Sequence, residues 1–345
     1  MGHRVPVTAL GEATSLADRK RRAAERLVLV LPATHLDPDL RAVLRVYSPL
    51  GFALDPAGAE EPAQVQDLCA ELGARPPAAR PALLLQRGGP CPGATAWPPF
   101  VRLSAAKDTA LTRAVGRAWR REAAALGFHV MLGPDVEGLD AATTAALVAP
   151  DDEAAAACPL AFTNPPDGRP NEQDLPGLLA EDLAPVRTAL GAGARTLLAG
   201  HRVWSAFDER LPASACPALL GGRLRQAEGF RGLLLGEDLS LPAGQPPLAA
   251  EERLRLGVLA TVDAHLVAGS AAAWLGAWEA GIHLQEEEPG LDLLLEESEK
   301  RLRLAREGLL LGRRRPPSAM VGAPEHRELA LLAWARALDA SPPMS

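Results

Sequence analysis

Short apolar runs alternate with helical patterns along most of this chain, and this alternation constrains the fold more than any other feature. Between the apolar runs lie helical patterns such as residues 108–126, where Leu111, Val115 and Trp119 recur on one face. Strands that alternate with helices indicate βα units and a parallel sheet. Eight runs are read as buried strands, at residues 27–31, 50–54, 82–86, 128–132, 159–162, 196–199, 232–235 and 282–285. Eight units predict an α/β fold, a closed (β/α)₈ barrel of the TIM type.

The rest of the chain is assigned around this barrel. A short connection near residues 140–176 leaves room for one degraded βα unit, and residues 291–311 and 325–340 are read as amphipathic helices. The predicted organisation is a polar lead-in at 1–24, a barrel at 25–312 and a helical tail at 313–345. An open doubly wound sheet is the main alternative, but residues 31–35 do not form the Gly-rich phosphate loop that it usually carries.

Charge and cysteine usage exclude several classes of partner. The net charge is −7, with acidic and basic residues interspersed, which argues against a nucleic-acid-binding surface. Residues 1–22 contain no apolar run, so we expect neither a signal peptide nor contact with a membrane. The cysteines lie far apart without paired spacing, which favours reduced thiols and a cytoplasmic location. They are Cys69, Cys91, Cys158 and Cys216.

No cofactor or metal is expected. His129, His265 and His283 do not share the spacing of a metal site. Trp274 and Trp278 stand four residues apart, which is more typical of a buried helix face than of a platform for stacking sugar.

The polar residues that end two neighbouring strands are the strongest indication of function. The run at 196–199 leads to His201, and the run at 232–235 leads to Glu237 and Asp238. Polar groups at the carboxyl ends of barrel strands form the rim of the active site in this fold. Without further context, the acidic pair could also cap a following helix, and His201 could be a structural hydrogen-bonding group.

The amino-acid sequence of residues 194–241 resembles that of the bacterial β-N-acetylglucosaminidases of glycoside hydrolase family 3. In that family a strand ending in A-H precedes an Ala- and Ser-rich helix and then G-F-x-G-x-x-x-S-D-D-L-S-M. This chain has G-F-R-G-L-L-L-G-E-D-L-S-L at 229–241. The resemblance extends from about Leu27 to Leu338.

The resemblance implies that the catalytic positions are altered. The first Asp of the family's S-D-D is its nucleophile, and Glu237 stands there, one methylene longer. The family's D-S-H dyad, whose His is the acid/base, corresponds to Asn171 and Gln173. An amide does not exchange protons near neutral pH, so Gln173 cannot replace that His. Glu172 is a candidate replacement acid.

Several sugar-binding positions are implied in the same way. The family's D-Q-E-G-G matches residues 85–89, where Leu85 replaces the Asp and Gln86 is kept. A Lys-His pair that binds sugar corresponds to Leu160 and Ala161. The resemblance assigns the remaining substrate contacts to His201, Asp208 and Asp238.

Together these changes favour a family 3 barrel of carbohydrate or cell-wall metabolism that has lost most or all of its hydrolytic activity, in effect a pseudoenzyme. A carbohydrate or glycan fragment is the expected ligand. The alternative is an active glycosidase with a rebuilt carboxylate pair, Glu237 with Glu172. A barrel with unrelated chemistry is a third interpretation, because a fold does not fix function.

Overall fold

Parallel strands close into a barrel in the computed structural model, which describes residues 15–32, 35–36, 38–75, 81–163, 183–244, 246–311 and 313–340. Each strand pairs with its neighbours in chain order, and the last pairs with the first. The strands are β1 (Leu27–Pro32), β2 (Gly51–Asp55), β3 (Leu83–Gln86), β4 (Val130–Asp135), β5 (Ala156–Ala161), β6 (Thr196–Ala199), β7 (Leu233–Gly236) and β8 (Ala264–Ala268). The predicted barrel class is confirmed, and the open doubly wound sheet is excluded.

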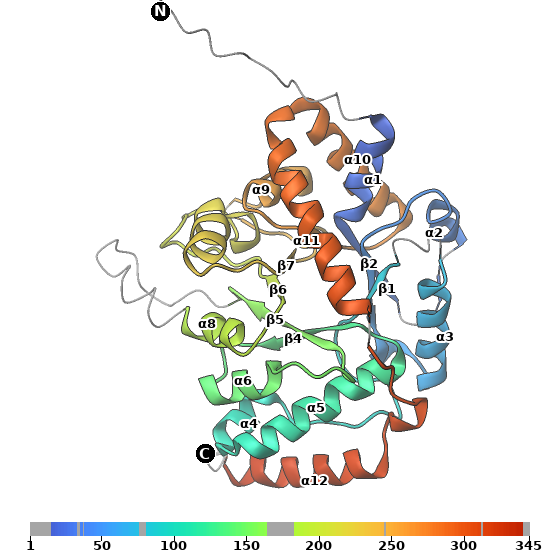
Figure 1. Ribbon diagram of the computed structural model, residues 1–345, viewed down its shortest axis with the longest axis vertical. Coiled ribbons are helices and arrows are strands. Elements are labelled where there is room, and N and C mark those ends of the chain that lie inside the picture. The colour runs from blue at the N-terminus through green and yellow to red at the C-terminus, as the bar shows by residue number, and fades with distance from the viewer. Residues whose placement is uncertain are drawn as a thin grey trace, which may run out of the picture.

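Helices surround the barrel (Figure 1). They are α1 (Leu16–Glu25), α2 (Pro38–Val43), α3 (Pro62–Gly73), α4 (Phe100–Ala106), α5 (Thr109–Leu126), α6 (Ala141–Val148), α8 (Ala184–Gly191), α9 (Ala250–Leu259), α10 (Ala271–Glu287), α11 (Asp292–Leu310) and α12 (Pro324–Asp339). The segment η4 (Ala218–Ala227) is a π-helix of 10 residues. Short 3₁₀ segments of three residues each are η1 (Pro56–Gly58), η3 (Ala213–Ala215), η5 (Pro289–Leu291) and η6 (Ser318–Met320). Helix α11 lies across the end at which the strands begin, and α12 packs on α4 and α5 (Figure 1).

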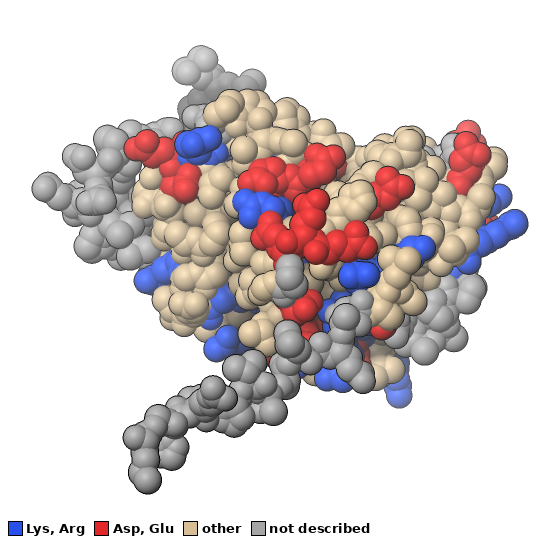
Figure 2. Space-filling model, turned by 90° about the horizontal axis from the view of Figure 1, so that it is seen from above, with Lys and Arg blue, Asp and Glu red and all other residues tan. Residues whose placement is uncertain are grey.

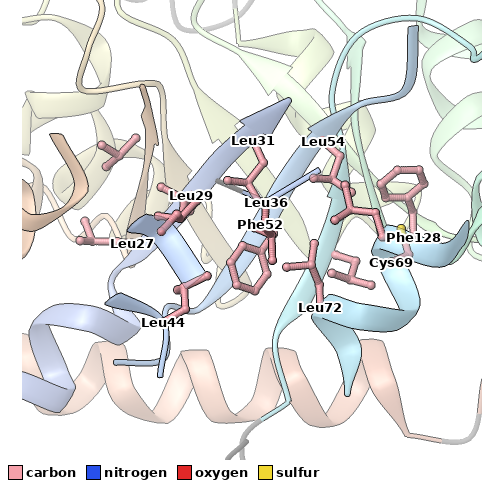
Figure 3. Packing of buried hydrophobic residues seen from close by; sticks show 14 of the residues in the cluster. Leu27, Leu29, Leu31, Leu36, Leu44, Phe52, Leu54, Cys69, Leu72 and Phe128 are labelled. Atoms are coloured by element: carbon pink, nitrogen blue, oxygen red, sulfur yellow. The ribbon is translucent and has the colours of Figure 1, made fainter. Parts of the chain in front are cut away.

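The two faces of each strand belong to different parts of the core. In β1, Leu27, Leu29 and Leu31 pack outward among the surrounding helices, together with residues of β2 and α3 (Figure 3). Val28 and Val30 belong to a second cluster inside the barrel. This alternation is the period of two that a strand imposes on its side chains. The interior cluster is aliphatic and includes Ala53, Leu83, Leu85, Val130, Cys158, Leu198, Leu233, Leu235, Ala264 and Leu266, with Leu302 and Leu309 of α11 below.

The prediction of the eighth strand was wrong. Residues 282–285 lie inside α10, where Trp274, Trp278 and Ile282 are buried at helical spacing. The true strand is β8, whose sequence A-H-L-V-A contains the buried His265. Because the polar His265 interrupts this short apolar run, hydropathy alone does not predict a strand there. Trp274 and Trp278 are core residues, as expected, and their rings are parallel with centroids 6.3 Å apart.

The fourth and fifth strands are displaced from their predicted positions. Strand β4 begins at Val130 because α5 continues to Leu126 and Gly127 then takes a φ of 111°. Strand β5 begins at Ala156, within an Ala-rich segment that favours a helix locally but pairs with β4. In the segment predicted to hold a degraded unit, α6 is a short helix of 8 residues.

The end of the molecule near α1, α9 and α10 carries acidic side chains around its centre (Figure 2). Basic side chains are interspersed rather than gathered there, which does not favour a nucleic-acid contact on this face. None of the described helices combines the length and apolar character needed to cross a membrane.

Replacing Gly51 with Ala is expected to destabilise the barrel. Gly51 begins β2, and a Cβ there would lie 2.3 Å from the carbonyl oxygen of Leu83 on β3. Since both atoms belong to paired strands, the backbone must shift, and overpacking of this kind costs about 1–3 kcal/mol. Urea unfolding measures the change. Gly73→Ala is the matched control, because a Cβ at Gly73 meets nothing within 4 Å, and an equal midpoint for both variants would contradict the prediction.

Candidate functional site

Glu237 stands at the carboxyl end of β7. Leu233 and Leu235 of this strand point into the barrel, and the alternation places Glu237 on the same inward side. Its Oε2 accepts a hydrogen bond of 2.8 Å from the backbone N–H of His201, two residues beyond the end of β6. The structure therefore brings together the two strand-end groups that the sequence singled out.

The imidazole of His201 is held on both sides. Its Nδ1 lies 2.7 Å from the Ser214 hydroxyl, and its Nε2 lies 2.8 Å from the carbonyl oxygen of Asp238. Burial, with a contribution from Arg253, lowers the pKa of His201 despite the opposing effects of Asp238 and Glu237. A neutral ring fits these contacts if Nε2–H donates to the carbonyl and Nδ1 accepts from the hydroxyl. His201 thus has structural partners on both ring nitrogens.

Asp238 is a buried carboxylate that joins three strand ends. Its Oδ1 accepts hydrogen bonds from the backbone N–H of Ser240 at 3.0 Å and of Ala268 at 2.9 Å, and from the Ser240 hydroxyl at 2.8 Å. Its Oδ2 lies 3.3 Å from Nη1 of Arg87, beyond β3. Burial alone would raise the pKa of Asp238, but these hydrogen bonds and Arg87 outweigh it and lower the pKa. Asp238 therefore stays ionised and links β7 to β8 and β3.

Of the two glycines after β3, Gly88 adopts a backbone conformation that favours glycine. Gly88 has a φ of 77°, and a Cβ there would lie 2.5 Å from Oδ1 of Asp55 at the end of β2. Gln86 is buried, and its Nε2 donates to the carbonyl of Gly89 at 3.4 Å. Among the described residues, Oε1 of Gln86 has no hydrogen-bond partner. Since Leu85 faces the barrel interior, Gln86 lies on the outer side of β3, in line with Leu54 and Met131 of the neighbouring strands.

Apolar side chains occupy the positions of three predicted sugar contacts. Leu85 and Leu160 join the aliphatic cluster inside the barrel. Ala161 packs on the outer side of β5, in a cluster with Val186 and Leu219. Leu85 and Leu160 are therefore inward-facing at their strand ends, whereas Ala161 belongs to the layer between sheet and helices.

Asp208 lies in the loop that follows β6. Its Oδ1 accepts hydrogen bonds from the backbone N–H of Arg210 at 2.8 Å and of Leu211 at 2.9 Å, so its described contacts shape the loop. Asn171, Glu172 and Gln173, the predicted dyad positions and replacement acid, lie outside the described residues.

A group at the ends of β4 and β5 was not singled out as a site from the sequence. The Thr163 hydroxyl lies 2.9 Å from Oδ2 of Asp135 and 3.0 Å from Oε2 of Glu137. Both acids stand in the G-P-D-V-E segment after the apolar part of β4, which is the sequence signal for them. They add acceptors at the same end of the barrel as Glu237.

The residues that lie against His201 and Asp238 were also missed. Ser214 and Arg253 come from η3 and α9, and Arg87 follows Gln86 directly. Nη1 of Arg253 lies 3.2 Å from Nε2 of His201, and its Nη2 donates to the carbonyl of Leu239. No local pattern marks these side chains, because each meets its partner only after barrel closure.

The carboxylates of Glu237 and Asp135 are hydrogen-bond acceptors at this end of the barrel. Such groups suit the hydroxyls of a polar ligand. In the part of the chain that the structure describes, no three His, Cys, Asp or Glu side chains come together as metal ligands.

A family comparison agrees with this geometry. The model described as Glycosyl hydrolase family 3 N terminal domain matches residues 166–286, which include β6, β7 and β8. The matched family is glycoside hydrolase family 3. The resemblance stated from residues 194–241 is thus confirmed by a match to the family model, and the closed parallel barrel is consistent with the (β/α)₈ fold of that family.

Solved structures share this fold at low sequence identity. A fungal multi-domain β-N-acetylglucosaminidase of the family superposes with a TM-score of 0.78 and 17% identity, over 91% of this chain and 42% of that chain. A family 3 β-N-acetylglucosaminidase from Paenibacillus sp. superposes with a TM-score of 0.76 and 20% identity, over 92% of this chain and 68% of that chain. A β-N-acetylhexosaminidase from Beutenbergia cavernae superposes with a TM-score of 0.67 and 18% identity, over 84% of this chain and 98% of that chain. No curated protein sequence matched the chain.

Proposed function

We propose that this chain is a family 3-type barrel that binds a carbohydrate at the carboxyl end of its strands and has lost most or all hydrolysis of β-N-acetylglucosaminides. The observation that carries this is the placement of Leu85 and Leu160. They pack into the barrel core at two strand ends where the family resemblance places an Asp and a Lys that bind sugar. An aliphatic side chain cannot form the hydrogen bonds that hold a sugar hydroxyl.

The proton-transfer groups support the same proposal. Gln173 occupies the position of the family's acid/base and cannot act as one. His201 is a poor substitute, because its Nδ1 contacts Ser214 and its Nε2 contacts the carbonyl of Asp238. Glu237 keeps the carboxylate of the nucleophile position, but one of its oxygens accepts from the backbone of His201.

Carbohydrate binding is supported by the acceptors that remain. The carboxylates of Glu237 and Asp135 stand at the carboxyl ends of β7 and β4, at the same end of one closed barrel. Sugars are bound largely through hydroxyl groups, which donate to such oxygens. The Paenibacillus and Beutenbergia proteins of the same fold are an N-acetylglucosaminidase and an N-acetylhexosaminidase, which makes an N-acetylhexosamine the first ligand to try.

We expect the purified protein to hydrolyse 4-nitrophenyl N-acetyl-β-glucosaminide undetectably or very slowly. Loss of the acid/base alone costs a factor of about 10²–10⁴, and a displaced nucleophile costs roughly a hundredfold more. Release of nitrophenolate is measured beside the Beutenbergia cavernae enzyme as a positive control. Turnover at about 1 s⁻¹ or faster, in the ordinary range of enzymes, would refute the loss of hydrolysis.

Binding is tested separately by calorimetric titration with N-acetylglucosamine and its β-1,4-linked dimer. We expect saturable binding that weakens in Glu237→Ala and persists in Glu209→Ala, a control at an exposed position of the loop after β6. Absence of binding to both sugars, or equal binding by both variants, would contradict the carbohydrate part of the proposal.

The rebuilt-glycosidase alternative makes a different prediction for the same assay. If Glu172 serves as the acid, then Glu237→Gln and Glu172→Gln should each abolish whatever turnover is found. An experimental structure would then place the two carboxyl groups about 5–5.5 Å apart for a retaining mechanism and about 6.5–9.5 Å apart for an inverting one.

A reducing compartment fits this proposal. Cys69, Cys91, Cys158 and Cys216 are all buried and free, which supports the expectation of a cytoplasmic location.

A further inference from the structure

A cavity of about 500 Å³ lies at the opposite end of the barrel from Glu237. One wall is α11, and the others are the segments that lead into β5, β6 and β7. Because parallel strands all begin at the same edge, Arg195 and Arg231, which stand just before β6 and β7, come to line one space. A volume of this size lies within the range of about 300–1,000 Å³ typical of small-molecule sites.

The lining of this cavity is rich in cations. Five arginines contribute to it, against two acidic residues. The arginines are Arg120, Arg195, Arg231, Arg301 and Arg313, and the acids are Asp151 and Asp152.

Part of this charge is already balanced. Asp151 pairs with Arg117 and Arg121, which lie outside the cavity lining. Arg301 donates from Nε to Asp263 at 2.8 Å. Asp151 and Arg301 are thus already paired outside the lining, which leaves four arginines and one acidic residue, Asp152.

The other arginines form no salt bridge with a described residue, although Asp152 lies near enough to Arg313 to interact with its charge. Arg120 is 2% exposed, its Nη atoms donate to the carbonyls of Ala149 and Ala155, and its Nε has no partner. Arg313 donates to the carbonyl of Ala154 at 2.6 Å. The guanidinium groups of the exposed Arg195 and Arg231 form no ion pair with any described residue. Even with Asp152 beside Arg313, the lining keeps a surplus of positive charge.

Apart from Arg301, the α11 wall of the cavity is apolar. Leu304 and Leu311 line it and are 59% and 71% exposed, which is unusual for leucines beside a hollow. Gly308 lies between them, and a Cβ built there would meet nothing within 4 Å. The space beside the helix is thus open, and its surface is suited to an apolar group.

We propose that this cavity binds an amphipathic oxyanion, a phosphate or carboxylate group on a short apolar body. Arginine forks bind either oxyanion through paired N–H groups, and Arg195, Arg231 and Arg313 supply them. Leu304, Leu311 and the open face at Gly308 receive the apolar body. The site is separate from the carbohydrate end, so the proposal does not depend on the proposed function.

Calorimetric titration with four probes tests the proposal: octyl phosphate below its micelle concentration, octanoate, octyl glucoside and inorganic phosphate. We expect one octyl oxyanion to bind with one-to-one stoichiometry at least about tenfold more tightly than the two control probes. The order of octyl phosphate and octanoate identifies the preferred head group. Binding should weaken as salt is raised, because partly exposed charges are screened.

Two variants locate the site. Arg195→Gln/Arg231→Gln should weaken binding about tenfold or more, whereas Arg102→Gln/Arg113→Gln, at exposed positions on α4 and α5, changes the same charge and should not. Gly308→Leu should fill the cavity and abolish binding while the melting temperature stays equal or rises, since Gly is a poor helix former. No binding of either octyl oxyanion, equal binding of octyl glucoside, or unchanged binding in Gly308→Leu would overturn the proposal.

Discussion

Replacing Asp263 with Ala is expected to lower the free energy of unfolding by about 3–5 kcal/mol. Asp263 is fully buried just before β8, and its Oδ2 lies 2.8 Å from Nη2 of Arg225. Its Oδ1 accepts from Nε of Arg301 at 2.8 Å and from the Ser298 hydroxyl at 2.9 Å, so α11 is fastened to the barrel through this carboxylate. Removing it leaves the buried guanidinium of Arg225 without its counter-charge, and an unpaired buried charge is far more costly than a lost surface pair.

Urea unfolding followed by circular dichroism measures this change. Glu297→Ala removes an exposed carboxylate that pairs with Lys300 on α11, and it should cost less than about 1 kcal/mol. If Asp263→Ala unfolds at the same urea concentration as Glu297→Ala, then the buried network contributes little and the prediction is wrong.

Acid should destabilise this protein through His265. Its imidazole is buried on β8, and a Cβ at either Gly236 or Gly257 would lie 2.3 Å from one of its ring nitrogens. Burial, with smaller contributions from His201, Arg26 and Arg253, lowers the pKa of His265 to about 3. The ring is therefore neutral in the folded protein.

The direction of the pH effect follows from this lowered pKa. The unfolded chain takes up a proton at His265 near the ordinary histidine pKa of 6.5, whereas the folded chain does so only near pH 3. Stability from this group is thus complete above about pH 6.5 and is lost as the pH falls toward 3. Each pH unit within that window costs about 1.4 kcal/mol, which gives about 3 kcal/mol between pH 6.5 and pH 4.

Urea midpoints measured from pH 7 down to pH 4 test this prediction. The decline should be shallower in His265→Leu than in the unchanged protein, by about 3 kcal/mol over the window. It should not vanish, because burial also lowers the pKa of His129 to about 4. His283→Leu, at an exposed position of α10, is the matched control. Parallel pH profiles for the two variants would show that His265 is not the responsible group.

His265 also explains why one strand could not be predicted from the local sequence. Strand β6 was predicted with its exact bounds because T-L-L-A is a short apolar run whose pattern needs no partner to be recognised. Strand β8 was missed because its His265 breaks the apolar run, and what lets it stay buried is the absence of a Cβ at Gly236 and Gly257, which lie elsewhere in the chain. The helix that was taken for that strand has its own apolar face, which hydropathy alone cannot distinguish from a strand over four residues.

The sequence by itself determined the barrel, the strand ends at His201 and Glu237, and the family to which residues 166–286 are matched. These depend on apolar periodicity and on short stretches of the chain, and both are local. The tertiary structure decided which groups meet. Arg87 reaches Asp238 across 151 positions of sequence, and Arg195, Arg231 and Arg313 share a cavity only because the strands begin at one edge and α11 crosses it. Such contacts are fixed by closure of the barrel, and no spacing along the chain encodes them.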